Sequence, residues 1–237
     1  MSPIHPDTWF AGYPYGGGGT GAYTPLAPYL DGRPLHVPVL PGRDGRRHEA
    51  PLTEFGALAD DLFAQLEPEL AARSARPLVL FGYSLGGMLA LEMALRIESA
   101  GAGPLALVVG GTAAPDRWPP RRIAGLDDAS FVQALRELGV APAELLDEPW
   151  VRQAFMPTWR ADTRVAESAP RRTVTLRCPV HAVAGDRDPL AGMHDLASWE
   201  RTGGPGSSSS LVTGDHGTLV RNPEALGRAL RMAASIR

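Results

Sequence analysis

The feature that most constrains this chain is the pentapeptide Gly82-Tyr83-Ser84-Leu85-Gly86, which lies between a run of mostly apolar residues, 77–82, and a helical stretch, 88–97. This order predicts a strand, a sharp turn and a helix. A serine hydroxyl becomes a nucleophile when a turn exposes it, an adjacent N–H can meet an oxyanion and a base is near. The glycines allow a tight turn. The Leu85 N–H would lie at the N-terminus of the helix, where the helix dipole favours negative charge. Ser84 is therefore the candidate nucleophile and Leu85 a candidate oxyanion-hole donor.

Composition removes several other kinds of chemistry. All 23 basic residues are arginine, which excludes a Schiff-base lysine, a P-loop lysine and the lysine of short-chain dehydrogenases. The formal net charge is -3 and no basic stripe is present, so we expect no nucleic acid partner and a small or acyl-bearing one instead. No segment approaches the ~18 apolar residues of a membrane helix or has the pattern of a signal peptide. We therefore expect a cytoplasmic protein without a membrane contact.

Short apolar runs alternate with helical patterns along most of the chain. This alternation predicts an α/β fold with a mostly parallel sheet and helices on both faces. Ligands bind such sheets at the carboxyl ends of the strands, where Ser84 would lie. The Gly/Ser-rich residues 203–210 are predicted to form a loop. The predicted strands are 8–12, 35–40, 78–82, 105–110, 180–185 and 211–213, and the predicted helices are 52–72, 87–100 and 223–234.

One long segment interrupts the alternation. Residues 116–172 show helical patterns at 129–138 and 142–162 and no strand. We predict a single domain over residues 1–237 in which this segment is a helical lid above the sheet. Its aromatic residues either pack between helices or line an acyl pocket, and we place Phe155 and Trp159 among the candidate substrate-binding residues.

The base and the acid of a serine mechanism are sought in loops at the same edge of the sheet. His216 follows the predicted strand 211–213 and precedes the last helix, so it is the candidate general base. Three carboxylates, Asp188, Asp116 and Asp186, also follow strands, and each gives the chain order serine, acid, histidine of α/β-hydrolases. We favour Asp188, while Asp116 and Asp186 stay open.

A second oxyanion donor is expected from the glycine-rich loop after the first strand. Residues 14–19 read Pro-Tyr-Gly-Gly-Gly-Gly, and we assign the donor to Gly16. The same loop matches a dinucleotide fingerprint through Gly16, Gly18 and Gly21, but a glycine-dense loop meets that pattern easily. The histidines lack the spacing of metal ligands, so we expect neither a metal nor an organic cofactor.

Motifs along almost the whole chain resemble a known family, the stand-alone type II thioesterases of polyketide synthase and nonribosomal peptide synthetase pathways, in the α/β-hydrolase superfamily. The resemblance lies in the proline-glycine loop at 14–27, the Pro-Gly-Arg motif at 41–43, the nucleophile turn and helix at 81–94, the Arg-Ala-Asp element at 160–162, and the acid and histidine loops at 185–189 and 214–219.

The resemblance implies hydrolysis of acyl thioesters on the phosphopantetheine arm of an acyl or peptidyl carrier protein. Such enzymes remove aberrant or stalled units. The carrier protein is then the partner, no cofactor is needed, and we expect a monomer. Two other functions stay open: a related serine acyl hydrolase or cyclase that uses the same triad, and a catalytically silent module that binds carrier proteins.

Two positions depart from the family pattern. Tyr83 stands where a histidine is usual, and we count it among the candidate substrate-binding residues. Gly217 and Thr218 replace two phenylalanines that commonly follow the histidine. Loss of this bulk predicts a recessed wall beside His216, which would let medium-length acyl chains compete with acetyl.

Overall fold

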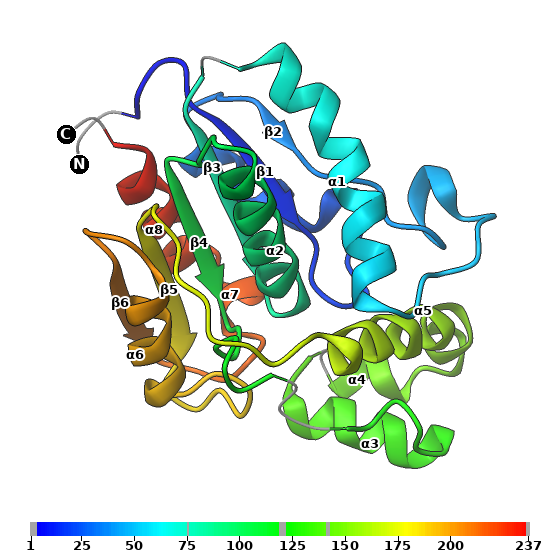
Figure 1. Ribbon diagram of the computed structural model, residues 1–237. Helices are drawn as coiled ribbons and strands as arrows, with labels where there is room; N and C mark the ends of the chain where they lie inside the picture. Colours follow the sequence, from blue (N-terminus) through cyan, green and yellow to red (C-terminus); the bar gives the residue numbers. More distant parts are fainter. Residues whose placement is uncertain (1–3, 75, 119–121, 141–142, 236–237) are drawn as a thin grey trace.

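Six parallel strands form the centre of the molecule in the computed structural model, which describes residues 4–74, 76–118, 122–140 and 143–235 (Figure 1). Their order across the sheet is β2-β1-β3-β4-β5-β6, and every neighbouring pair is parallel. All strands therefore end at the same edge, where the loops that follow them gather. The strands are β1 (Trp9–Tyr13), β2 (Leu35–His36), β3 (Leu78–Tyr83), β4 (Ala106–Gly110), β5 (Val180–Gly185) and β6 (Ser208–Val212).

The central strands are apolar because the sheet is covered on both faces. Every residue of β1, β3, β4 and β5 is buried, as expected for a parallel sheet between two helical layers. Alternate residues of β3 enter opposite layers of the core: Leu78 and Leu80 lie in one cluster, and Val79 and Phe81 in the other. The predicted α/β fold is confirmed.

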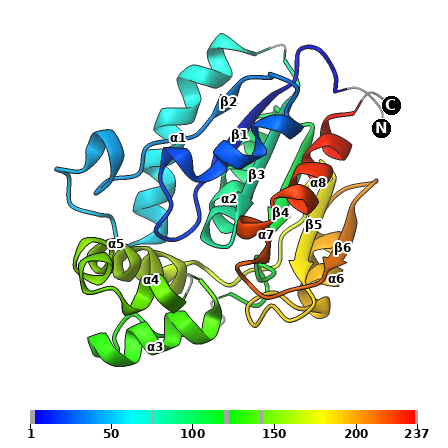
Figure 2. The same cartoon turned by 180° about the vertical axis from the view of Figure 1, so that it is seen from behind.

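Helices cover the two faces of the sheet (Figure 2). One face packs against α1 (Phe55–Ala72), α2 (Leu85–Ser99) and α6 (Met193–Thr202), and the other against the 3-10 helix η1 (Thr20–Tyr29) and α8 (Glu224–Ala234). Among the described residues, no helix combines the length and the apolar character that crossing a membrane requires.

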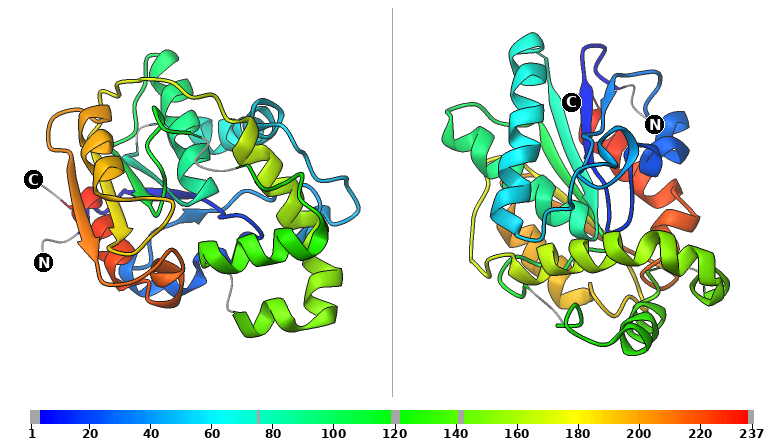
Figure 3. Two further views of the ribbon diagram at one scale, coloured as in Figure 1. Left: turned by 90° about the horizontal axis from the view of Figure 1, so that it is seen from below. Right: turned by 90° about the vertical axis from the view of Figure 1, so that its right-hand side faces the viewer.

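Three helices between β4 and β5 lie beyond the carboxyl edge of the sheet, as the two views of Figure 3 show. They are α3 (Asp128–Leu138), α4 (Ala143–Asp147) and α5 (Pro149–Ser168). The Asp127 side chain caps α3 by accepting the Ser130 N–H, and Gly139 ends that helix in the left-handed conformation. Phe131, Leu135 and Leu146 belong to a small core that these helices share.

Several element boundaries differ from those predicted. β2 ends at His36 rather than at residue 40, because Pro38 has no N–H to donate to a neighbouring strand. β6 begins at Ser208, inside the predicted loop 203–210, because its backbone pairs with β5 from His181 onward. The segment 142–162 forms two helices, since Pro149 begins α5; Pro142 itself lies outside the described residues. The short helices η1, η2 (Asp44–Arg46), α6 and α7 (Thr218–Arg221) were not predicted.

Candidate active site

Ser84 occupies the turn between β3 and α2 in a conformation that is rare for residues other than glycine. Its φ is 54° and its ψ is -122°, and such a backbone persists only where the surroundings impose it. The Ser84 N–H donates to the Gly110 carbonyl at 2.8 Å. A Cβ on Gly82 would overlap the Gly86 backbone, and one on Gly86 would overlap the Tyr13 carbonyl. The two glycines therefore permit the close approach that presents the Ser84 hydroxyl at the edge of the sheet.

His216 connects Ser84 to Asp188. Its Nε2 lies 3.0 Å from the Ser84 Oγ, and its Nδ1 lies 2.9 Å and 3.0 Å from the two carboxylate oxygens of Asp188. The carboxylate is held in place because its Oδ1 also accepts the N–H groups of Leu190 and Ala191 at 2.8 Å and 3.2 Å. His216 and Asp188 are buried. This geometry can move a proton from the serine to an oriented imidazole.

The other two carboxylates bind elsewhere. Asp116 accepts a hydrogen bond from the Ser198 hydroxyl at 2.9 Å. Asp186 accepts the Gly214 N–H at 2.9 Å and so fixes the loop that carries His216. Of the three candidates, the structure brings Asp188 to the imidazole.

Tyr83 packs beside the imidazole of His216. The centroids of the Tyr83 and His216 rings lie 5.0 Å apart. Burial raises the pKa of the Tyr83 hydroxyl, and the charge of Asp188 raises it further, so the phenol stays neutral. Tyr83 lines a cavity of about 130 Å³ together with Ser84, His216 and Gly217. It supports the histidine by packing against its ring.

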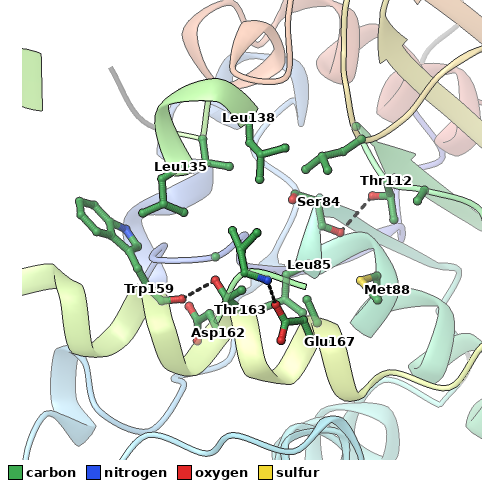
Figure 4. Close-up of a pocket in the computed structure, with 17 residues that line it drawn as sticks. Ser84, Leu85, Met88, Thr112, Leu135, Leu138, Trp159, Asp162, Thr163 and Glu167 are labelled. Carbon is green, nitrogen blue, oxygen red and sulfur yellow. Dashed lines mark hydrogen bonds between the residues drawn. The ribbon is translucent and has the colours of Figure 1, made fainter. Parts of the chain in front are cut away.

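Another cavity, of about 120 Å³, also opens on Ser84 (Figure 4). Its lining is mostly apolar, and α3 and α5 supply much of it. Of the two candidate pocket residues on α5, Trp159 lines this cavity and Phe155 does not. Phe155 is 41% exposed, and its ring stacks on Trp159 with the centroids 5.7 Å apart. The apolar side chains of the lining are Leu85, Met88, Ala113, Ile123, Leu135, Leu138, Val140, Trp159, Ala166 and Leu190.

Helix α3 contributes two residues to this cavity that were not among the predicted site residues. Leu135 and Leu138 lie on the inner face of α3, and Figure 4 shows them across the cavity from the α5 residues. The apolar residues of this helix recur at helical spacing, which predicted a buried face. The spacing does not indicate which part of the molecule the apolar face of α3 covers.

The oxyanion-hole candidates lie beside the nucleophile. Leu85 is the first residue of α2, so its N–H points out of the positive end of the helix. Gly16 lines the same cavity as Ser84 and Leu85. The end of β1 is tied to this turn by Tyr23, whose hydroxyl donates to the Tyr13 carbonyl at 2.6 Å and accepts the Tyr83 N–H at 3.0 Å.

The wall beside His216 is hollowed at Gly217, as predicted, by the cavity that Tyr83 and Ser84 also line. A Cβ on Gly217 would overlap the guanidinium of Arg221 and approach the Gly139 carbonyl at 2.9 Å. Thr218 points away and donates its hydroxyl to Asp215 at 3.3 Å. Arg221 thus occupies part of the space beside Gly217, and the cavity that remains there adjoins Ser84.

Comparison with known proteins decides the family. A family model described as "Thioesterase domain" matches residues 11–233. The chain belongs to the thioesterase family. The two predictions made from the motifs, the recognition of the family and its thioesterase activity, are confirmed.

Relatives of this thioesterase include two proteins that are themselves named thioesterases. It is 35% identical over 213 residues to Thioesterase TesA of Mycobacterium marinum, covering 89% of this chain and 84% of that protein. It is 38% identical over 168 residues to Thioesterase PikA5 of Streptomyces venezuelae, covering 70% of this chain and 59% of that protein.

Solved structures place this thioesterase in the type II group. The type II thioesterase BorB from the borrelidin biosynthetic cluster is 32% identical, with a TM-score of 0.80 over 98% of this chain and 95% of that one. The likeness therefore extends over the sheet and over α3, α4 and α5. The chain is a type II thioesterase of the kind found in polyketide and nonribosomal peptide pathways.

Proposed function

We propose that this thioesterase hydrolyses acyl groups from the phosphopantetheine arm of an acyl or peptidyl carrier protein and so removes aberrant or stalled units. The observation that carries the proposal is the hydrogen-bonded series Ser84, His216 and Asp188 at the mouth of an apolar cavity. An apolar cavity suits an acyl chain, and the series suits attack on its thioester carbonyl.

In the acylation step, the Ser84 Oγ attacks the thioester carbonyl while the Nε2 of His216 takes the serine proton. Asp188 accepts the Nδ1–H, which fixes the tautomer in which Nε2 is free to act as a base. The N–H groups of Gly16 and Leu85 face the negative oxygen of the tetrahedral intermediate. Collapse of this intermediate breaks the carbon–sulfur bond, and His216 returns the proton to the leaving thiol.

In the deacylation step, water takes the place of the thiol. His216 removes a proton from the water, which attacks the acyl-serine, and the free acid leaves with Ser84 restored. The acyl chain occupies the cavity between α3 and α5 during both steps. The nucleophile, the base, the acid and the oxyanion donors in these steps all belong to the chain, water is the second substrate, and the phosphopantetheine belongs to the acyl substrate.

We also propose that residues 1–237 act as one domain in which about 116–172 form the lid. Val165 and Ala169, from the end of this segment, lie in the same core cluster as Leu80 of β3 and Leu89 of α2. This shared core supports one cooperative unit. A monomeric state and a cytoplasmic location stay predictions from the sequence.

A comparison of carriers tests the proposal. Acetyl, butyryl and hexanoyl groups are presented on a holo carrier protein, on coenzyme A and on p-nitrophenol, and kcat/KM is measured for each, with the Ser84→Ala variant as the background. We expect the carrier-bound thioesters to give the highest kcat/KM. Equal values on the nitrophenyl esters would contradict a carrier-directed enzyme and support a general acyl hydrolase. Release of a lactone or lactam from a hydroxyacyl or aminoacyl carrier would support a cyclase.

A further inference from the structure

A buried ion pair joins helix α5 to the loop that carries Gly16. The Oδ1 of Asp162 accepts a hydrogen bond from the Arg43 Nη2 at 2.6 Å, and its Oδ2 accepts one from the Arg43 Nη1 at 2.9 Å. The same Oδ2 also accepts the backbone N–H of Gly17 at 2.7 Å. The side chains of Arg43 and Asp162 are 9% and 4% exposed. A single carboxylate thus binds an arginine through two hydrogen bonds and the residue next to Gly16 through a third.

Two further contacts hold the same loop. The Nη1 of Arg43 donates to the Gly18 carbonyl at 2.7 Å. Trp159, which lies one helical turn before Asp162 and on the same face of α5, covers Gly17 so closely that a Cβ there would overlap its indole. The Gly17 N–H and the Gly18 carbonyl, which follow Gly16 in the loop, are therefore bound by Asp162 of α5 and by Arg43.

Stability gives a weak reason for such a pair. Removing two charges from water costs about as much as their attraction returns, so a buried ion pair adds little over apolar packing. A bidentate pair does, however, fix the orientation of both charged groups. Here the two oriented groups also bind the Gly17 N–H and the Gly18 carbonyl, so they fix the position of the backbone there.

We propose that Asp162 is a positioning residue that, together with Arg43, holds the loop of residues 14–19 so that the Gly16 N–H meets the oxyanion. This inference rests on the proposed roles of Ser84 and Gly16. Since Asp162 and Trp159 both belong to α5, the helix that lines the acyl cavity also sets the oxyanion hole. A displacement of α5 would open the cavity and withdraw the Gly16 donor together.

The experiment uses Asp162→Ala and Asp162→Asn with two readouts. The first is kcat and KM for a hexanoyl thioester of N-acetylcysteamine, and the second is the affinity for an alkyl trifluoromethyl ketone, which forms a tetrahedral adduct with an oxyanion. We expect Asp162→Ala to lower kcat about 100-fold, because loss or misplacement of one oxyanion donor has an effect of that order. KM should change by less than about threefold, since the ground-state carbonyl is bound weakly by this donor.

The ketone affinity separates positioning from a general structural effect. It should fall by about the same factor as kcat, because the adduct resembles the transition state. Asp162→Asn keeps the shape of the side chain but loses its charge, so its kcat and its ketone affinity should lie between those of wild type and Asp162→Ala. In the double variant Arg43→Ala/Asp162→Ala, kcat should fall little further than in the single variants, because the two residues act as a unit.

The pair formed by Arg46 and Asp61 provides a matched control. It is also bidentate, at 2.7 Å and 2.8 Å, but it joins η2 to α1. We expect Asp61→Asn and the Asp162 variants to lower Tm, whereas kcat in Asp61→Asn should stay within about twofold of wild type.

Three results would overturn the inference: wild-type kcat in Asp162→Ala, a loss confined to KM, or a fall in kcat with unchanged ketone affinity. If Asp162→Ala does not fold, Asp162→Asn decides by the same criteria. Failure of the proposed function looks different. In that case wild type does not cleave the thioester, whereas ketone binding to wild type and to the variants still measures the oxyanion hole.

Discussion

The Nε2 atom of His216 lies 3.0 Å from the Oγ of Ser84, although 132 residues separate them along the chain. Ser84 follows β3 and His216 follows β6, and two strands lie between these in the sheet. The contact is possible because both loops leave the same carboxyl edge of the parallel sheet. The proposed chemistry therefore depends on the sheet order as much as on the nucleophile turn.

Removal of the nucleophile is expected to abolish turnover without unfolding the protein. Ser84→Ala should lower kcat by a factor on the order of 10^6, because the members of a triad act as a unit. Steady-state hydrolysis and thermal unfolding are measured together, with Ser198→Ala as the control for loss of a buried hydroxyl. Retention of more than about a tenth of the activity would remove Ser84 from the mechanism.

The choice of acid is tested by two matched substitutions. Asp188→Asn should lower kcat by roughly 100- to 10,000-fold, because the amide favours the wrong histidine tautomer. Asp116→Asn should have an effect of about tenfold or less, since Asp116 binds Ser198 rather than the imidazole. A larger effect at Asp116 than at Asp188 would reverse the assignment.

Chain-length preference should respond to the α3 wall of the cavity. Leu135→Ala removes three carbons from the lining, and each methylene of substrate that the new space accepts contributes about 0.8 kcal/mol. The ratio of kcat/KM for hexanoyl to acetyl thioesters should rise on the order of tenfold. Leu146→Ala is the control, because Leu146 is buried among the same helices without lining the cavity. An unchanged ratio in Leu135→Ala, or an equal rise in the control, would show that α3 does not select the acyl chain.

Stability at mildly acidic pH should depend on His36. Burial lowers the pKa of this residue, and the nearby Arg73 lowers it further; its Nε2 is buried without a hydrogen-bond partner in the described structure. The unfolded chain therefore binds a proton more readily than the folded one, so the free energy of unfolding decreases as pH falls below about 6.5.

In His36→Gln, the fall in Tm between about pH 7.5 and pH 5.5 should be smaller than in wild type. His48→Gln, at an exposed loop position, serves as the control and should keep the wild-type slope. If both variants follow the wild-type curve, burial of His36 does not contribute to the acid sensitivity of the fold.

The parts of the site that could be predicted from the sequence are those that local patterns determine. The glycines around Ser84 indicate a tight strand-to-helix turn, and the positions of Asp188 and His216 after strands place them at the same edge. These inferences need only the rule that parallel strands end together. The bounds of β2 and β6 were harder to predict, because pairing with a neighbour, rather than residue preference, decides where an edge strand begins and ends.

The remaining parts depend on packing between distant segments. Asp162 and Gly17 are 145 residues apart in the chain, and no local sequence pattern at either residue predicts that they contact each other. The wall formed by Leu135 depends on how α3 lies over the sheet edge. Arg221 occupies part of the space beside Gly217, which the substitution pattern alone did not indicate. Which distant side chains contact each other is determined by the tertiary structure.

The most direct test of the central claim is the mass of the acyl-enzyme. Wild-type protein is mixed with a hexanoyl thioester, quenched in acid during the first turnover and digested, and the peptides are analysed by mass spectrometry. The account predicts a hexanoyl group on the peptide that contains Ser84, and its absence from Ser84→Ala treated in the same way. Hydrolysis without any acylated peptide, or an acyl group on another residue, would contradict it.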